Sequence, residues 1–350
     1  MNDPCAVFFG FSFRHHGLHT AVLGLARELS DPIVIDVSPP RPRWTPHWLD
    51  WSLNWRWLYY AEYRLLPYYR SDRPCVIHHY LSEKTMFRDH RWKRDHRLVA
   101  TCNQPLERIL EEDGNPRRAM YRTALEACHA VIVQTTGDVE TFASASKIPR
   151  PTYIPLGVDC SFFTPPAEPT TPGRPLILTV GDWLRDYAVW AESVRRLADE
   201  GLEAEFVVVA NRDTLAEAAR LLGSSRANVR FLHGISDEAL LALYRRATLF
   251  FLPLHNDMGN DALLEALATG CPMVLTDLTA TREYAGDAAV YIRLGSAESA
   301  VSAIRALVGD EVRRIQLGRA ARARAVERCD WPRLADRHRT LYRSLDKAKA

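Results

Sequence analysis

Short apolar runs alternate with longer amphipathic segments along most of the chain. In the first half, these runs predict strands at 6–11, 33–37, 75–78, 98–101, 130–133 and 152–154. Most of the runs are continuously apolar rather than alternating, which is typical of parallel strands buried on both faces. Between the first two runs, apolar residues recur at helical spacing over 18–29. Strand–helix alternation of this kind indicates right-handed βαβ units around a parallel sheet.

A proline-rich segment at 164–175 interrupts this pattern. Proline fixes φ and lacks a backbone donor, so the segment predicts a linker. The strand pattern then restarts, at 176–180, 206–210, 229–232, 248–252, 272–276 and 289–292. We therefore expect an α/β protein with two Rossmann-like, doubly wound parallel-sheet domains, over 1–165 and 166–330, facing across a cleft. Ligands of such sheets bind beyond the carboxyl ends of the strands, which makes the cleft the expected site.

The last part of the chain is helical and basic. We interpret its arginines as a solvated helix face. They stand at positions 313, 314, 319, 322 and 324. Trp331 and Pro332 begin a final helix, and we expect 331–350 to pack back on the N-terminal domain.

Composition excludes several classes of protein. The 350 residues are 47% hydrophobic and 25% charged, as in ordinary globular proteins. Because 45 basic residues balance 43 acidic ones, nothing indicates a nucleic-acid partner. No apolar run reaches the roughly 18 residues of a spanning helix, and the N-terminus lacks a basic signal region, so we expect a cytoplasmic protein. The seven cysteines are scattered, which favours buried thiols over a disulfide framework or a zinc site.

The strongest chemical signal lies between Asp257 and Pro272 and follows an apolar run. Gly259 permits a turn, Asn260 or Asp261 can cap a helix, and Gly270 can end it. Free N–H groups at the start of such a helix suit a diphosphate.

Asp257 and Glu265 stand eight positions apart around this turn. Carboxylates accept hydrogen bonds from sugar hydroxyls, so two of them flanking a phosphate-binding turn fit a nucleotide sugar. The alternative from the pattern alone is a capped amphipathic helix with exposed acids.

The unit at 257–272 resembles the E-x7-E signature of retaining glycosyltransferases of the GT-B fold, in particular glycosyltransferase family 4. Other segments resemble the motifs of that family in the same order: 129–135, 154–159 with Phe163 and Pro165, 179–181, and 229–234. The resemblance extends well over roughly 95–340 and loosely over the first third of the chain.

The resemblance implies a retaining, hexosyl-type transfer from a UDP- or GDP-linked sugar, with the nucleotide sugar as co-substrate and with neither a metal nor a further cofactor. Glu265 would hold the ribose hydroxyls, and Asp257 would contact the donor sugar. The remaining implied donor-binding residues are Gly17, Gly181, Gly234, Ile235, Met258, Gly259 and Asn260.

The chain departs from the family pattern at several positions. The first acid is Asp257 instead of glutamate, and Asn103 replaces the histidine of the first domain. Asp182 and Tyr187 stand in the segment where the family carries an arginine and a lysine, which leaves Arg185 as the cation there. We therefore name Asp257, Asn103 and Arg185 as candidate catalytic residues. The alternative is a catalytically impaired paralogue that binds a nucleotide or a partner.

Acceptor residues are expected in the first domain. His79 and Glu83 follow a predicted strand and could face a polysaccharide, lipid-linked or small-molecule acceptor. Trp48 and Trp51 belong to an aromatic segment at 44–69. That segment is either a helix packed on the first sheet or a platform for the acceptor or for peripheral membrane contact.

Overall fold

The structure is a computed structural model. In it the chain forms two compact units. The first unit holds the described residues up to Pro155 together with those from Trp331 onward, and the second runs from Leu156 to Asp330 and includes His19. The described residues are 6–10, 19, 21–30, 32–36, 63–68, 70, 75–81, 96–102, 116–143, 147–167, 173–257 and 259–347.

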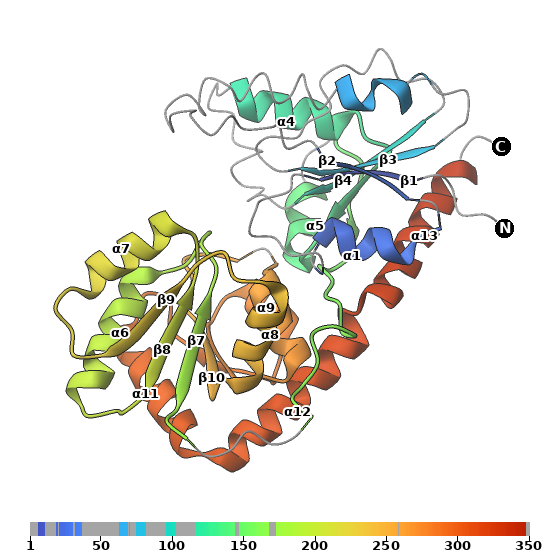
Figure 1. Ribbon diagram of the computed structural model, residues 1–350. Coiled ribbons are helices and arrows are strands. Elements are labelled where there is room, and N and C mark those ends of the chain that lie inside the picture. Colours follow the sequence, from blue (N-terminus) through green and yellow to red (C-terminus); the bar gives the residue numbers. More distant parts are fainter. Residues whose placement is uncertain are drawn as a thin grey trace. The chain divides into compact units, whose positions relative to one another are not determined.

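The first unit contains a six-stranded parallel sheet in the order β2-β1-β3-β4-β5-β6 (Figure 1). Its strands are β1 (Ala6–Gly10), β2 (Ile33–Asp36), β3 (Val76–Leu81), β4 (Arg97–Cys102), β5 (Ala130–Val133) and β6 (Thr152–Tyr153). Its helices are α1 (Ala21–Glu28), α4 (Pro116–Glu126), α5 (Thr136–Ala143) and α13 (Trp331–Lys347). Each strand lies at a position that the apolar pattern predicts.

Helix α13 completes the core of the first unit. Its buried Trp331 and Tyr342 pack in one cluster with Leu25 of α1 and with Val76 and Val99 of the sheet. Figure 1 shows α13 beside α1. The first unit is therefore discontinuous in sequence.

The second unit contains a six-stranded parallel sheet in the order β12-β11-β10-β7-β8-β9. Its strands are β7 (Leu176–Val180), β8 (Glu205–Val209), β9 (Asn228–Leu232), β10 (Leu249–Leu252), β11 (Met273–Thr276) and β12 (Val290–Ile292). Its helices are α6 (Tyr187–Asp199), α7 (Arg212–Leu222), α8 (Asp237–Arg246), α9 (Asp261–Thr269), α10 (Thr279–Ala285), α11 (Ala297–Gly309) and α12 (Glu311–Arg328).

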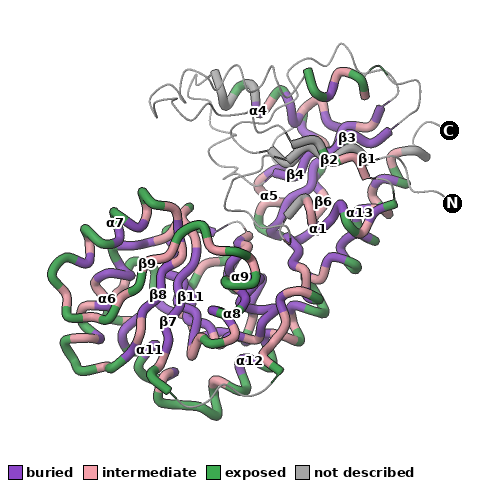
Figure 2. Tube along the Cα trace, viewed as in Figure 1, coloured by how far each residue is buried: buried purple, intermediate pink, exposed green. Residues whose placement is uncertain are grey.

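Helices cover both faces of the second sheet, so its central strands are buried throughout (Figure 2). Side chains of β7 alternate between two hydrophobic clusters: Leu176, Leu178 and Val180 face one, and Ile177 faces the other. This arrangement explains why the strand sequences are continuously apolar.

The boundary between the units precedes the proline-rich segment, so the expected boundary at 165 is displaced. Leu156, Val158 and Phe163 are buried in a cluster of the second unit. The backbone N–H of Leu156 also donates to the hydroxyl of Tyr284 on α10. The chain is therefore anchored in the second unit before its composition changes.

The interpretation of the basic helices as a solvated face is wrong for three arginines. Arg314 donates to the carbonyl of Leu307, and Arg324 donates to that of Glu283. Arg322 of α12 donates to the carbonyls of Phe163 and Ala268. These guanidinium groups bond the carbonyls at helix ends and in loops, whereas Arg313 and Arg319 are exposed as expected.

Candidate active site

The second sheet has a topological switch point between β7 and β10. The chain continues from β7 to β8 on one side, whereas β10 lies on the other side of β7. In open α/β sheets, the carboxyl ends of strands at such a point form the ligand-binding edge. The segment after β7, 181–186, and the segment after β10, 253–260, both begin here.

Backbone hydrogen bonds tie these two segments together. Asp186 donates its N–H to the carbonyl of Pro253 over 2.9 Å, and His255 donates to the carbonyl of Leu184 over 3.0 Å. Leu184 takes a φ of 62°, a left-handed conformation that costs energy for a side chain of its size. The loop is thus held in one conformation by its neighbour.

Arg185 lies half-buried within this pair of loops. Its guanidinium donates to the carbonyl of Val180 at 3.1 Å, to that of Trp183 at 2.7 Å and to Oδ1 of Asn260 at 3.1 Å. A Cβ atom at Gly181 would collide with the guanidinium, and Gly181 has a φ of 104°. Glycine at 181 therefore makes room for a cation at the carboxyl end of β7.

Helix α9 begins beside that cation. Asn260 is its N-cap and accepts a hydrogen bond from the N–H of Leu263 at 3.3 Å. Gly259 precedes the cap with a φ of 109°, and Gly270 ends the helix in the left-handed conformation. The first-turn N–H groups of α9 and the guanidinium of Arg185 together provide a positive environment for an anion.

Both acids around this turn are withdrawn from solvent. Asp257 is 9% exposed and Glu265 is 5% exposed, so the alternative of a helix with exposed acids is wrong for these two residues. Burial raises the pKa of Glu265 to about 8, and the nearby charge of Asp261 adds to this effect. The hydroxyl of Tyr244, on α8, lies 2.9 Å from Oε2 of Glu265.

Gly234 and Ile235 are two of the implied donor-binding residues, and they lie in the loop between β9 and α8. Gly234 has a φ of 60°, and the half-buried Ile235 packs against the core cluster that contains Tyr244. The loops after β7 and β10 and the helix α9 contain the other described candidates: Gly181, Asp257, Gly259, Asn260 and Glu265.

The candidate acceptor residue His79 differs from expectation. It lies within β3 instead of after a strand, and it is fully buried. The other candidates fall outside the described residues: Gly17, Trp48, Trp51, Glu83, Asn103 and Met258. Of the aromatic segment at 44–69, the structure describes Tyr63, which is exposed, and Tyr68, which packs against a core cluster.

The sequence missed two side chains that support α9. Tyr244 contacts Glu265 from 21 positions away, and Arg322 caps the carbonyl of Ala268 from 54 positions away. Each residue lies on a helix that the pattern predicts, but its contact depends on how the helices pack.

Two further features concern metal ions and membranes. Within the described ranges, no three His, Cys, Asp or Glu side chains are grouped so that they could hold a metal ion. No helix in those ranges combines the length and the apolar character needed to cross a membrane.

The chain is similar in structure to a solved sucrose-phosphate synthase and to solved glycosyltransferases. Sucrose-phosphate synthase from Thermosynechococcus elongatus matches with a TM-score of 0.77 and 17% identity, over 99% of this chain and 100% of that one. Together with the two parallel-sheet units, this likeness defines a protein of the GT-B fold. Residues 174–310 match the family model of glycosyl transferases group 1.

Two curated relatives carry the name D-inositol 3-phosphate glycosyltransferase. The protein from Corynebacterium aurimucosum is 31% identical over 134 residues, which is 37% of this chain and 31% of that protein. The protein from Corynebacterium urealyticum is 27% identical over 277 residues, which is 71% of this chain and 65% of that protein. The match therefore spans less than two thirds of the length of either relative.

Proposed function

We propose that the protein is a retaining glycosyltransferase that moves a hexose-type sugar from a UDP- or GDP-linked donor to an acceptor. The observation that carries this proposal is the contact between Arg185 and the N-cap of α9, with the two buried acids Asp257 and Glu265 in the same segment. One cation and a helix N-terminus favour a diphosphate, and the carboxylates favour the hydroxyl groups on either side of it.

In the proposed reaction, the bond between the sugar and the diphosphate breaks on the face where the acceptor binds. Arg185 and the first N–H groups of α9 stabilise the negative charge of the leaving diphosphate. Asp257 stabilises positive charge at the anomeric carbon, and Glu265 holds the ribose. The leaving phosphate accepts the proton of the acceptor hydroxyl, so the protein needs no separate base, and this charge distribution requires no metal.

We propose a polyhydroxylated acceptor. The names of the relatives support a small phosphorylated polyol or sugar, because they include D-inositol 3-phosphate glycosyltransferase and sucrose-phosphate synthase. Polysaccharide and lipid-linked acceptors are the other classes to be compared with it.

The test is donor hydrolysis without an acceptor. We expect the purified protein to release UDP or GDP slowly from the matching nucleotide sugar, and Glu265→Ala to abolish that release. Glu298→Ala is the matched control, because Glu298 is an exposed acid in the first turn of α11 in the same unit. Hydrolysis that persists in Glu265→Ala would contradict the site, and the anomeric configuration of the transferred sugar tests retention.

A specific observation favours a second candidate, a nucleotide- or partner-binding protein without turnover. Asp182 accepts a hydrogen bond from the N–H of Asn211, and the hydroxyl of Tyr187 donates to the carbonyl of Gly181. These two positions thus carry structural contacts in place of the family's cations. Two results together would favour this candidate: calorimetry that detects binding of UDP or GDP, and an assay that detects no hydrolysis of UDP- or GDP-linked sugars.

A further inference from the structure

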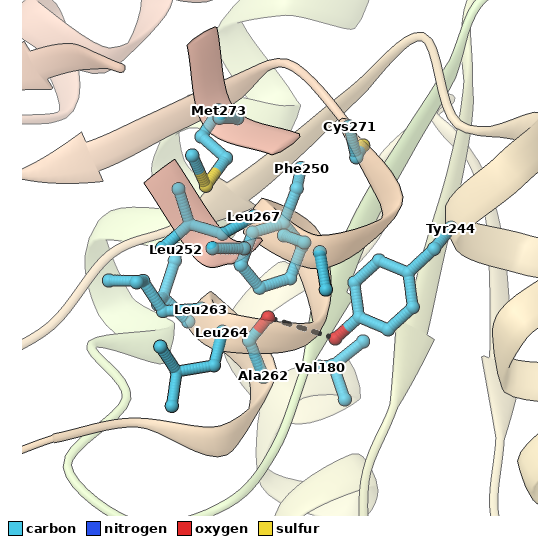
Figure 3. Packing of buried hydrophobic residues seen from close by; sticks show 14 of the residues in the cluster. Val180, Tyr244, Phe250, Leu252, Ala262, Leu263, Leu264, Leu267, Cys271 and Met273 are labelled. Atoms are coloured by element: carbon cyan, nitrogen blue, oxygen red, sulfur yellow. Dashed lines mark hydrogen bonds between the residues drawn. The ribbon is translucent and has the colours of Figure 1, made fainter. Parts of the chain in front are cut away.

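The hydroxyl of Tyr244 lies between two oxygen atoms of α9. It is 3.1 Å from the carbonyl oxygen of Ala262 and 2.9 Å from Oε2 of Glu265. Figure 3 shows the first of these contacts, with Tyr244 directed at the first turn of the helix. A tyrosine hydroxyl has one proton to donate, so it cannot donate to both oxygen atoms at once.

The carbonyl of Ala262 can only accept a hydrogen bond, whereas the carboxyl group of Glu265 can donate one when it is protonated. Both contacts are satisfied together if Glu265 donates to Tyr244 and Tyr244 donates to Ala262. The alternative arrangement, with a carboxylate that accepts from Tyr244, leaves Ala262 without this additional contact.

The surroundings of Glu265 favour the protonated arrangement. Burial raises the pKa of the carboxyl group most, and Asp261 on the same helix and Asp237 on α8 raise it further. A hydrogen bond donated by Tyr244 and the charge of Arg185 act in the opposite direction, but the net shift is upward. Tyr244 itself keeps its proton, because burial and the neighbouring Glu265 and Cys271 raise its pKa well above the ordinary value. Its ring is fixed by edge contact with Phe163 and by a tilted contact with Phe250.

We propose that Tyr244 is a positioning residue of the donor site that holds Glu265 as a neutral acid in the empty protein, and that a nucleoside diphosphate expels this proton when its ribose hydroxyls bind the carboxylate. The inference rests on the proposed function, because it assigns the ribose to Glu265. The O–H bond of the carboxyl group breaks, and the proton passes to the buffer. The ribose hydroxyls then donate to the resulting carboxylate, and Tyr244 keeps its hydrogen bond to the carbonyl of Ala262.

Proton release makes binding pH-dependent in a defined direction. Below the pKa of the empty protein, each nucleotide must displace a proton, so affinity rises with pH until Glu265 is already ionised. Above that value the dependence disappears.

Calorimetry of UDP and of GDP in buffers of different ionisation enthalpy counts the released protons. Near neutral pH we expect the wild-type protein to release about one proton more per bound nucleotide than Glu265→Gln. The glutamine variant carries no titrating group at 265, so the difference removes the contribution of the nucleotide phosphate. Equal proton release by the two proteins would overturn the proposal.

Tyr244→Phe separates the two arrangements, because the ring and its packing remain. If Glu265 donates to Tyr244, removing the hydroxyl destabilises the neutral acid, and fewer protons are released per bound nucleotide than by the wild-type protein. If Tyr244 donates to a carboxylate, removing the hydroxyl raises the number of protons released per bound nucleotide, and that result would overturn the proposal. Binding of neither nucleotide by the wild-type protein would instead reject the proposed function, so the two failures differ.

Discussion

Nη2 of Arg185 and Oδ1 of Asn260 are joined by a hydrogen bond of 3.1 Å between residues 75 positions apart. The bond connects the loop after β7 to the first turn of α9, across the switch point of the second sheet. Asn260 therefore caps the helix and orients a guanidinium with the same oxygen atom.

This relationship predicts the effect of removing the cation. Arg185→Met keeps an unbranched stem but loses the charge, and we expect affinity for UDP or GDP to fall by about 10- to 100-fold in calorimetry. The control is Arg293→Met, which removes an exposed arginine paired with Glu298 on the same unit. Unchanged affinity in Arg185→Met, with an unchanged melting temperature, would exclude Arg185 from the anion site.

The crossing of α9 and α12 predicts a stability change. A Cβ atom at Gly318 would collide with the backbone carbonyl of Gly270, whereas one at Gly309, the last residue of α11, meets nothing within 4 Å. We expect Gly318→Ala to lower the free energy of unfolding by about 1–3 kcal/mol. Gly309→Ala should leave it unchanged or raise it slightly. Urea unfolding compares the two, and equal values would contradict the close helix crossing.

Two buried histidines predict acid sensitivity of α13. The ring of His78 is hydrogen-bonded to the hydroxyls of Tyr342 and Thr101, at 2.7 Å each. Burial, followed by the charge of His338, lowers the pKa of His78 well below the ordinary value. Burial also lowers the pKa of His338 to about 4. Because the unfolded chain binds protons more readily, this stability is present above about pH 6.5 and is lost as pH falls toward 4.

The measurement is the melting temperature between pH 4 and 8. We expect His338→Phe, which cannot titrate, to show a weaker decline in acid than the wild-type protein. His255→Gln changes an exposed histidine and should follow the wild-type curve. A decline that is identical in all three proteins would refute the role of His338.

Glu265 predicts the opposite pH dependence. Its folded pKa is raised, so its contribution to stability is present at low pH and is lost as pH rises through about 8. Since a pKa difference of one corresponds to about 1.4 kcal/mol, Glu265→Gln should be more stable than the wild-type protein by about 2–4 kcal/mol above that pH. Urea unfolding at pH 5 and pH 9 checks this, with the exposed Glu217→Gln as control. A constant difference between the two pH values would be evidence against a neutral Glu265.

Local pattern was sufficient for most of the fold. Apolar runs located the strands of both sheets, and they were clearest for central strands such as β7 and β10, where burial on both faces leaves few polar positions. Local signals also mark the ends of α8, because Ser236 caps its start and Arg245 and Arg246 lie in its last turn. The domain boundary was misplaced because composition reports where a chain cannot fold regularly, and not where it joins a core.

The candidate site was predicted only where it is local. Asn260 and Gly270 are recognisable as helix ends from neighbouring residues. The partnerships of Arg185 with Asn260 and of Tyr244 with Glu265 are set by strand order and helix packing, which no short pattern encodes. Arg322 was misread for the same reason, because charge alone does not distinguish a solvated guanidinium from one that bonds helix carbonyls.

The discontinuity of the first unit has a consequence during synthesis. The segment Leu156–Asp330 is continuous in sequence, whereas the earlier residues lack Trp331, Leu334 and Tyr342 of their core until α13 has been synthesised. We therefore expect the order of domain maturation to run against the order of synthesis. A nascent chain that stops before α13 would depend on chaperones to shield the uncovered side of its first sheet.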